Sequence, residues 1–145
     1  MSLAMSRAER EAFLADVHIG LLAVAEPGRA PLVIPIWYAF AEGEVRFVTA
    51  RASRKGRLLA EARRCSLCVQ SESPPYKYVT IEGPVVDIAA ADRERDVRPL
   101  AHRYLGSVLG DRYVDELAPA GENVLVRVRP EHWLSVDYAK EYSGA

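Results

Sequence analysis

The sequence has almost no net charge, only two cysteines and no long hydrophobic run. Its 145 residues include 19 Lys and Arg against 20 Asp and Glu, which gives a formal net charge of -1. This balance argues against the general electrostatic attraction that supports binding to nucleic acids and anionic membranes. No apolar stretch approaches the roughly 20 residues that span a bilayer, and the first residues lack the basic and hydrophobic regions of a signal peptide. We therefore expect a cytoplasmic protein with no nucleic-acid and no membrane partner.

The two cysteines, Cys65 and Cys68, have the CxxC spacing of a redox pair or of half a zinc site. They lie in a run typical of a β-strand, where positions three apart face opposite sides of the sheet. The sequence has no second CxxC, and His18, His102 and His132 lack metal-ligand spacing. We therefore predict small apolar strand residues and no metal site. For His102 and His132 we expect surface or interface positions rather than roles as proton donors.

The pattern of apolar residues and turn signals predicts one domain, over residues 6–140, made mainly of strands. Ser6 and Glu9 have the spacing of a capping box, Gly106 is suited to end a helix, and Gly83-Pro84 should bend a long strand. Helices are expected at 6–16, 54–62, 92–105 and 107–117, and strands at 20–25, 30–40, 45–49, 65–70, 76–88 and 123–138, the last kinked near Pro130. The first three strands should form a meander. Hairpin connections with few covering helices favour an antiparallel sheet closed into a barrel.

Three cations, Arg54, Lys55 and Arg57, follow a Ser53 N-cap in the first turns of the second predicted helix. A helix N-terminus already carries roughly half a positive charge and several unpaired N–H groups, so cations there are disfavoured. A bound anion resolves the conflict, because backbone amides and the Ser53 hydroxyl can donate to it while Lys55 and Arg57 neutralise its charge. Gly56 would let the ligand or a neighbouring backbone approach closely. The alternatives are a solvated charged face and, on a barrel, a binding site for single-stranded nucleic acid.

Five motifs follow one another along the chain in a specific order and spacing: Phe13-Leu14 before Gly20–Val24, Gly28–Trp37, Phe47–Thr49 followed by Ser53–Lys55, Tyr78–Gly83, and Arg103–Gly106. In these motifs the chain resembles the pyridoxamine 5'-phosphate oxidase-like split β-barrel family, in its short flavin- or deazaflavin-dependent branch. The resemblance covers nearly the whole chain. It implies a mainly β fold with α, a six-stranded antiparallel split β-barrel with flanking helices. It also implies a homodimer with two cofactors in clefts at the interface.

The resemblance further implies that the cofactor phosphate contacts Thr49, Ser53 and Lys55, together with Arg54 and Arg57. This is the segment already reached from the electrostatics of the helix start. The two arguments are independent, and together they predict a phosphate site there.

A second implied contact is the flavin ring, which in this family lies along the backbone of the second strand. That would place Val33, Ile34, Pro35, Ile36 and Trp37 beside the ring. Because proline cannot donate to a ladder, Pro35 itself indicates an irregular or edge strand, which fits a backbone turned toward a ligand. A core strand with one bulge remains the alternative.

Two further aromatic residues, Tyr78 and Trp133, would either reach the cleft from the partner subunit or pack at the interface, where aromatic residues are enriched. The sequence does not decide between these roles.

The implied activity needs no catalytic constellation, because a flavin itself carries the hydride chemistry and the protein binds and orients it. We therefore expect an oxidoreductase that transfers a hydride between FMN or coenzyme F420 and a small electron-poor substrate, with no catalytic residue assigned. The cations Arg51, Arg54 and Arg57 would suit the anionic tail of F420, which favours F420 mildly. The alternative is a non-catalytic protein that binds or sequesters a flavin or haem, and a less favoured one is a nucleic-acid-binding barrel.

Overall fold

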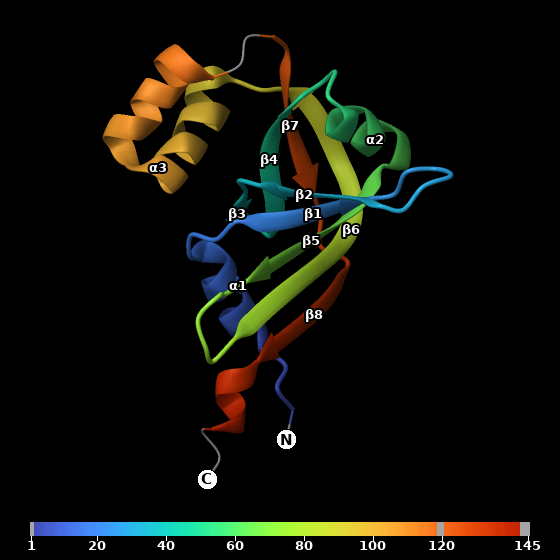
Figure 1. Cartoon of the computed structure of the whole chain (residues 1–145), viewed down its shortest axis with the longest axis vertical. Helices are drawn as coiled ribbons and strands as arrows, with labels where there is room; N and C mark the ends of the chain where they lie inside the picture. The colour runs from blue at the N-terminus through green and yellow to red at the C-terminus, as the bar shows by residue number, and fades with distance from the viewer. Residues whose placement is uncertain (1, 119–120, 143–145) are drawn as a thin grey trace.

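A computed structural model describes residues 2–118 and 121–142 as a curled antiparallel sheet with helices around it (Figure 1). The elements follow in the order α1 (Arg7–Ala15), β1 (Gly20–Val24), β2 (Leu32–Ile36), β3 (Ala39–Ala41), β4 (Glu44–Ala50), α2 (Arg54–Ala62), β5 (Arg64–Gln70), β6 (Lys77–Ala90), η1 (Arg93–Val97), α3 (Arg98–Arg112), η2 (Tyr113–Leu117), β7 (Asn123–Val128), β8 (His132–Asp137) and η3 (Tyr138–Glu141). In this part of the chain no helix is long and apolar enough to cross a membrane.

The sheet follows the path β2-β1-β5-β6-β7-β4-β3, and β8 pairs with β6 off this path. The long strand β6 joins the two halves of the sheet. Its first half pairs with β5 and β8, and its second half pairs with β7 after a register shift between Val85 and Asp87. The prediction of a bend in this strand is therefore confirmed, although the irregularity follows Gly83-Pro84. The sheet curls around β6 into a half-barrel.

The prediction of six strands was wrong, because the described residues form eight. The strand expected at 30–40 breaks after Ile36 into β2 and β3, and the strand expected at 123–138 breaks after Val128 into β7 and β8. The predicted meander was wrong for the same reason. β2 pairs with β1 and β3 pairs with β4, so β2 and β3 lie at opposite ends of the path.

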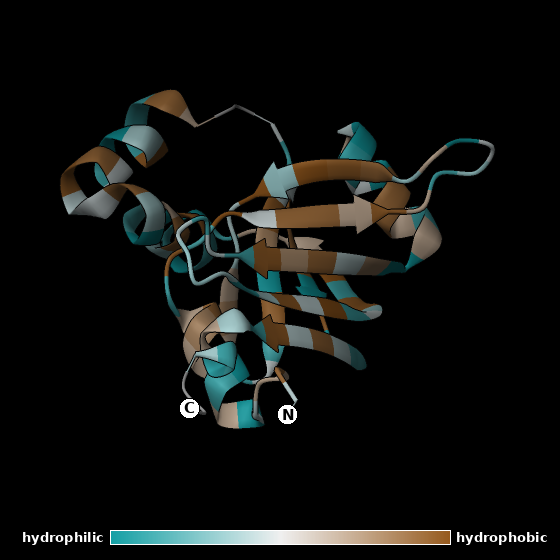
Figure 2. Cartoon of the chain, turned by 60° about the horizontal axis from the view of Figure 1, so that its bottom comes forward, coloured by the Kyte–Doolittle hydropathy of each residue, from teal (hydrophilic) through white to brown (hydrophobic). Residues whose placement is uncertain are grey.

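Alternating burial along the strands builds one core inside the curl. Strands β4, β5 and β7 bury every second residue, and Figure 2 shows hydrophobic residues recurring along the strands of the sheet. Leu14 of α1 and Leu59 of α2 are fully buried, so both helices pack on the sheet. Cys65 is buried and Cys68 is half-buried, both with free thiols, as expected for strand residues on opposite faces. The core also includes Met5, ahead of the first helix.

The predicted helix starts are confirmed by their caps. The Ser6 hydroxyl accepts from the N–H of Glu9 at 3.2 Å, and the Glu9 carboxylate accepts from the N–H of Ser6 at 2.8 Å. Ser53 caps α2 by accepting from the N–H of Gly56 at 3.0 Å. Both helices therefore begin at the residues that the sequence indicates.

A helical hairpin, defined as η1, α3 and η2 (residues 93–117), connects β6 to β7. Gly106 has a φ of +80° and divides it into two arms, as the sequence predicts. Figures 1 and 2 both show the hairpin projecting to one side of the sheet. The chain on either side of the hairpin meets at the sheet, where the N–H of Ala91 donates to the carbonyl of Asn123 at 2.9 Å.

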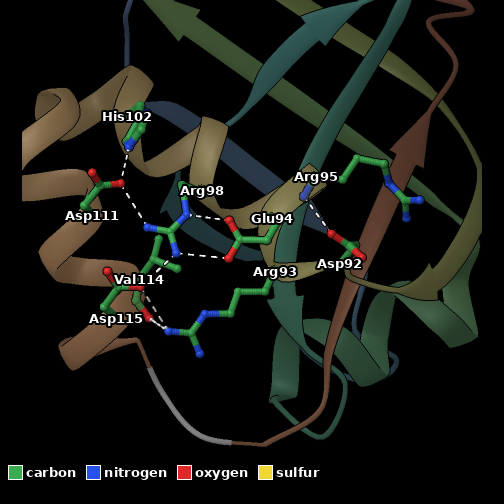
Figure 3. A network of polar contacts seen from close by, with 9 residues as sticks. All are labelled: Asp92, Arg93, Glu94, Arg95, Arg98, His102, Asp111, Val114 and Asp115. Carbon is green, nitrogen blue, oxygen red and sulfur yellow. Dashed lines mark hydrogen bonds and ion pairs between the residues drawn. The ribbon is translucent and has the colours of Figure 1, made fainter.

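Polar contacts hold the two arms together (Figure 3). Arg98 of the first arm donates to Asp111 at 2.9 Å and to Asp115 at 2.8 Å in the second arm, and His102 lies 2.6 Å from Asp111. Hydrogen bonds from His102 and Arg98 lower the pKa of Asp111, and those from Arg98 lower the pKa of Asp115. The arms therefore form one unit while both carboxylates are charged.

Candidate functional site

A cavity of about 660 Å³ lies between the sheet, the start of α2 and the helical hairpin. This volume is in the range of small-molecule sites in proteins, and its walls are mostly apolar with a few polar groups, as such sites usually are. The lining residues are Ile19, Pro35, Ile36, Trp37, Val48, Thr49, Ala50, Ser53, Lys55, Val97, Leu100, Tyr113, Ala118 and Asn123.

The polar corner of the cavity is formed where β4 passes into α2. Thr49, at the end of β4, is buried, and its hydroxyl lies 3.3 Å from that of Ser53. The Ser53 hydroxyl also donates to the carbonyl of Ala50 at 2.7 Å, so its proton is directed toward the protein rather than toward the cavity. With that proton used, Thr49 is the donor in its contact with Ser53, and the N–H of Gly56 also donates to Ser53. A ligand at this corner is therefore offered the Lys55 ammonium and the backbone N–H groups at the start of α2 that Ser53 does not cap. The Thr49 hydroxyl becomes a donor to the ligand when it turns away from Ser53.

Lys55 is the one cation among the described residues that line the cavity. Its side chain is half-buried and forms no ion pair with any described carboxylate, and the loss of water around the ammonium lowers the pKa of Lys55. A partly desolvated cation without a counter-ion is costly unless an anion joins it. The corner is therefore electrostatically suited to an anion.

Gly56 is required by the backbone of the loop that enters α2. A Cβ atom at this position would lie 2.4 Å from the carbonyl oxygen of Ala50 and 2.8 Å from that of Arg51. The sequence analysis expected Gly56 to let either a ligand or a neighbouring backbone approach closely. The close approach of the Ala50 and Arg51 carbonyls is sufficient to require glycine here. The close packing holds the first turn of α2 against the end of β4.

The other predicted phosphate-binding cations lie outside the cavity lining. Arg54 forms an ion pair with Glu26 of the β1–β2 turn, and this contact is the main cause that lowers the pKa of the Glu26 carboxylate. Arg57 is exposed. Arg51, proposed for a cofactor tail, pairs with Glu122 at 2.7 Å. Only Lys55 of this basic segment contributes its charge to the cavity walls.

Of the predicted ring-binding residues Val33–Trp37, only the last three line the cavity. Pro35, Ile36 and Trp37 line the cavity, whereas Val33 is 58% exposed and Ile34 packs against the core. β2 is an edge strand, as expected for a strand that contains proline. Only the C-terminal end of β2 and the residue after it therefore line the described cavity.

The remaining predicted residue, Tyr78, lies away from the cavity lining. It sits near the start of β6, between Gln70 of β5 and Val136 of β8. Trp133 is held within the same chain, where the Arg10 guanidinium lies 4.4 Å from its ring centroid. These positions leave both residues without a contact to the cavity in the described chain.

The helical hairpin supplies three lining residues that were not predicted from the sequence, and the other unpredicted ones are Ile19, Val48, Ala50, Ala118 and Asn123. Val97, Leu100 and Tyr113 form the wall opposite the sheet. The Trp37 ring stacks on that of Tyr104 with centroids 5.2 Å apart and lies 5.3 Å from that of Tyr113. The only sequence signal for this wall was the Arg103–Gly106 motif, which gave no indication of which residues face the cavity.

Residues 6–137 match the family model described as pyridoxamine 5'-phosphate oxidase. The chain belongs to this family. No curated protein matches the chain significantly in sequence. Among solved structures, an F420 reductase is similar to this family member with a TM-score of 0.73 and 25% identity, over 86% of this chain and 94% of that chain.

Two further structures resemble this pyridoxamine 5'-phosphate oxidase family chain. A conserved hypothetical protein from Mycobacterium tuberculosis has a TM-score of 0.81 and 25% identity, over 99% of this chain and 92% of that chain. The haem storage protein HutZ from Vibrio cholerae has a TM-score of 0.64 and 17% identity, over 94% of this chain and 96% of that chain. Similar folds therefore occur in proteins that are named for F420 and for haem.

The cavity of this family member suits a planar cofactor that carries a phosphate. One corner offers a cation and helix N–H groups, and the rest is apolar and partly aromatic. In the described chain no group of three or more His, Cys, Asp or Glu could hold a metal ion. The residues present therefore fit an organic anionic cofactor.

Proposed function

We propose that this protein is a flavin-type oxidoreductase that binds FMN or coenzyme F420 in the cavity. The observation that carries the proposal is Lys55, a half-buried cation that lines the cavity without an ion pair to any described carboxylate. The cofactor phosphate would accept from Lys55, from the uncapped N–H groups at the start of α2, and from the Thr49 hydroxyl once it turns away from Ser53. Of the remaining predicted contacts, Ser53 would line the same corner, and Arg54 and Arg57 would act at longer range.

When bound, such a cofactor supplies the hydride chemistry. The residues of the chain would bind it, orient it and exclude water: Pro35 and Trp37 would hold the ring from the side of the sheet, and Leu100 and Tyr113 from the hairpin. No Asp, Glu or His is among the described lining residues. The substrate should therefore be a small, electron-poor molecule that accepts a hydride without a strong acid from the protein.

Between the two cofactors we favour F420 mildly. The likeness to an F420 reductase at 25% identity, over 94% of that chain, supports this choice. The argument from extra cations is weaker than the sequence suggests, because Arg51 and Arg54 are already paired with Glu122 and Glu26. The choice between FMN and F420 depends on direct binding.

We also propose a homodimer formed through the outer face of the sheet. Hydrogen-bonded register places Pro35, Leu21, Cys68, Thr80 and Leu134 in one row across β2, β1, β5, β6 and β8. Leu21 and Leu134 in this row are 38% and 58% exposed, and Pro35 also lines the cavity. A second copy bound here would cover apolar surface and lie beside the cavity mouth.

Such a dimer would give Tyr78 the role considered from the sequence. Tyr78 alternates with the buried Val79 and so shares the outer face of β6 with Thr80. A partner on this face would contact Tyr78, either as interface packing or beside its own cofactor.

The second candidate is a protein that binds a flavin without turnover, which would use the same polar corner but need no room for a substrate above the ring. Haem fits less well, because no histidine, cysteine or methionine lines the described cavity and Tyr113 is its one side chain of a haem-ligand type. A bound reduced cofactor that no quinone or dye acceptor reoxidises would support storage over catalysis.

The deciding experiment is a pair of fluorescence titrations of the purified protein with FMN and with F420. We expect one of them to bind with a dissociation constant below about 100 μM, which corresponds to roughly 5.5 kcal/mol. Weaker binding by both would contradict the proposed function. Stopped-flow mixing of the reduced complex with a quinone then tests turnover.

A further inference from the structure

The break between β2 and β3 leaves backbone groups that a continuous strand would pair in the sheet. At the break, the N–H of Tyr38 donates to the hydroxyl of Tyr104 at 3.1 Å. The same hydroxyl lies 2.7 Å from the carbonyl oxygen of His18 and 3.1 Å from that of Tyr38, and it can donate to either. One side chain from the helical hairpin thus satisfies polar groups that are otherwise costly to leave unpaired.

The two segments held by this hydroxyl both supply walls of the cavity. His18 precedes Ile19, and Tyr38 follows Trp37; Ile19 and Trp37 line the cavity. The ring of Tyr104 stacks on Trp37 with an interplanar angle of 5°. Tyr104 is therefore connected to Trp37 twice, through the ring and through the backbone next to it.

The neighbouring Arg103 anchors the same arm of the hairpin to α1. Its guanidinium donates to the carbonyl oxygens of Leu14, Ala15 and Asp16 at 3.1, 3.0 and 2.8 Å. These are carbonyls at the C-terminus of α1, which has no basic residue in its last turn. A cation there satisfies unpaired carbonyls and the helix dipole, so the position of Tyr104 is firmly set.

The Tyr38 side chain completes this anchoring. It is fully buried, and its hydroxyl donates to the carbonyl of Leu14 at 2.9 Å. Burial raises the pKa of the Tyr38 phenol, which keeps it a neutral donor. The break between β2 and β3 is therefore held by two hydrogen bonds, one from the Tyr38 hydroxyl to α1 and one from the Tyr38 N–H to Tyr104 of the hairpin.

We propose that Tyr104 is a positioning residue that sets the ring of Trp37 as the aromatic wall of the cavity. It lies outside the described lining and acts through Trp37 and the Tyr38 backbone. The proposal rests on the proposed function only for the identity of the ligand. It explains the Arg103–Gly106 motif: Arg103 docks the hairpin, Tyr104 holds the break, and Gly106 turns the chain.

The test uses Tyr104→Phe, which keeps the ring and removes only the hydroxyl. The chain has two tryptophans, so a Trp133→Phe background leaves Trp37 as the single indole probe. We expect Tyr104→Phe to red-shift the emission of Trp37 and to increase its quenching by acrylamide in the ligand-free protein. The dissociation constant of FMN or F420 should rise about tenfold, the effect of losing roughly 1.4 kcal/mol of pocket organisation.

Tyr76→Phe is the matched control, because it also removes one tyrosine hydroxyl, from a residue that is 52% exposed. Unchanged Trp37 emission and quenching in Tyr104→Phe would overturn the proposal, even if the protein were less stable. The emission test does not need a ligand, so it decides this inference separately from the proposed function.

If Tyr104→Phe does not fold, amide exchange in the unaltered protein decides. Tyr38 lies outside any strand, yet its N–H should be protected from exchange by the Tyr104 hydroxyl. Exchange as fast as that of an exposed loop amide would overturn the proposal.

Discussion

Replacing Lys55 by methionine should weaken the cofactor and stabilise the ligand-free protein at the same time. The change keeps an unbranched apolar stem and removes the ammonium. A hydrogen bond to a charged group is worth about 1.5–3 kcal/mol, so the dissociation constant should rise roughly 10- to 150-fold. This is the expected loss if the phosphate lies against Lys55.

The opposite effect on stability follows from the direction of the pKa shift. Burial lowers the pKa of Lys55 below its ordinary value of 10.5, so the unfolded chain binds the proton more tightly than the folded one. The charge therefore opposes folding at neutral pH, and stability should increase as the pH rises from the folded-state pKa toward 10.5. Lys55→Met should raise the free energy of unfolding at neutral pH and abolish this alkaline increase.

The assays are fluorescence titration with FMN and F420, and chemical denaturation without ligand at neutral and alkaline pH. Arg129→Met is the matched control, because Arg129 is an exposed cation just after β7. The cavity-lining residue Asn123 lies at the other end of this strand. An unchanged dissociation constant in Lys55→Met would place the phosphate elsewhere. A less stable ligand-free variant would refute the argument that Lys55 is a desolvated, uncompensated cation.

Three further predictions concern the loop, the hairpin and the outer face. Gly56→Ala forces a Cβ to 2.4 Å from the Ala50 carbonyl oxygen, so denaturation should show a loss of about 1–3 kcal/mol, and binding should weaken. Arg98 lowers the pKa of Asp115 below its ordinary value of 3.8. The contact between these two residues therefore stabilises the hairpin fully above pH 3.8, and this stabilisation is lost as the pH falls through the lowered pKa. The protection factors of the hairpin amides, which compare the observed exchange with the intrinsic rate at each pH, should fall in acid, and Arg98→Met should reduce this dependence. Protection factors that do not change with pH would contradict the prediction. Leu134→Glu should yield a folded monomer by sedimentation and circular dichroism, whereas a monomeric parent would refute the proposed dimer.

The sequence was sufficient for features that depend on local chemistry. The capping box of Ser6 and Glu9, the Ser53 cap and the turn at Gly106 are set by residues a few positions apart, and all are found in the structure. The family resemblance is confirmed by the match over residues 6–137. The conflict between cations and the dipole at the start of α2 is also visible in the sequence, whereas the anion site inferred from it stays a prediction.

Features set by distant residues could not be predicted in this way. The run from Ala30 to Phe40 contains no glycine or asparagine at its break, which is held by Tyr104, a residue 66 positions away from Tyr38. Likewise, Arg54 and Lys55 are equivalent by sequence, but Arg54 is paired with Glu26, 28 positions earlier. The hairpin helices were expected, yet only tertiary contacts bring Tyr113 to the cavity.

The helical hairpin leaves and rejoins the sheet at neighbouring residues, since Ala90 pairs with Val124 and the N–H of Ala91 donates to Asn123. In terms of evolution, β6 and β7 form a scaffold that accepts an interchangeable cassette. Insertions, deletions and substitutions within the cassette can alter the cavity wall formed by Val97, Leu100 and Tyr113, while the strand register and the start of α2 stay unchanged. The shape of the cavity can therefore change through one contiguous stretch of sequence.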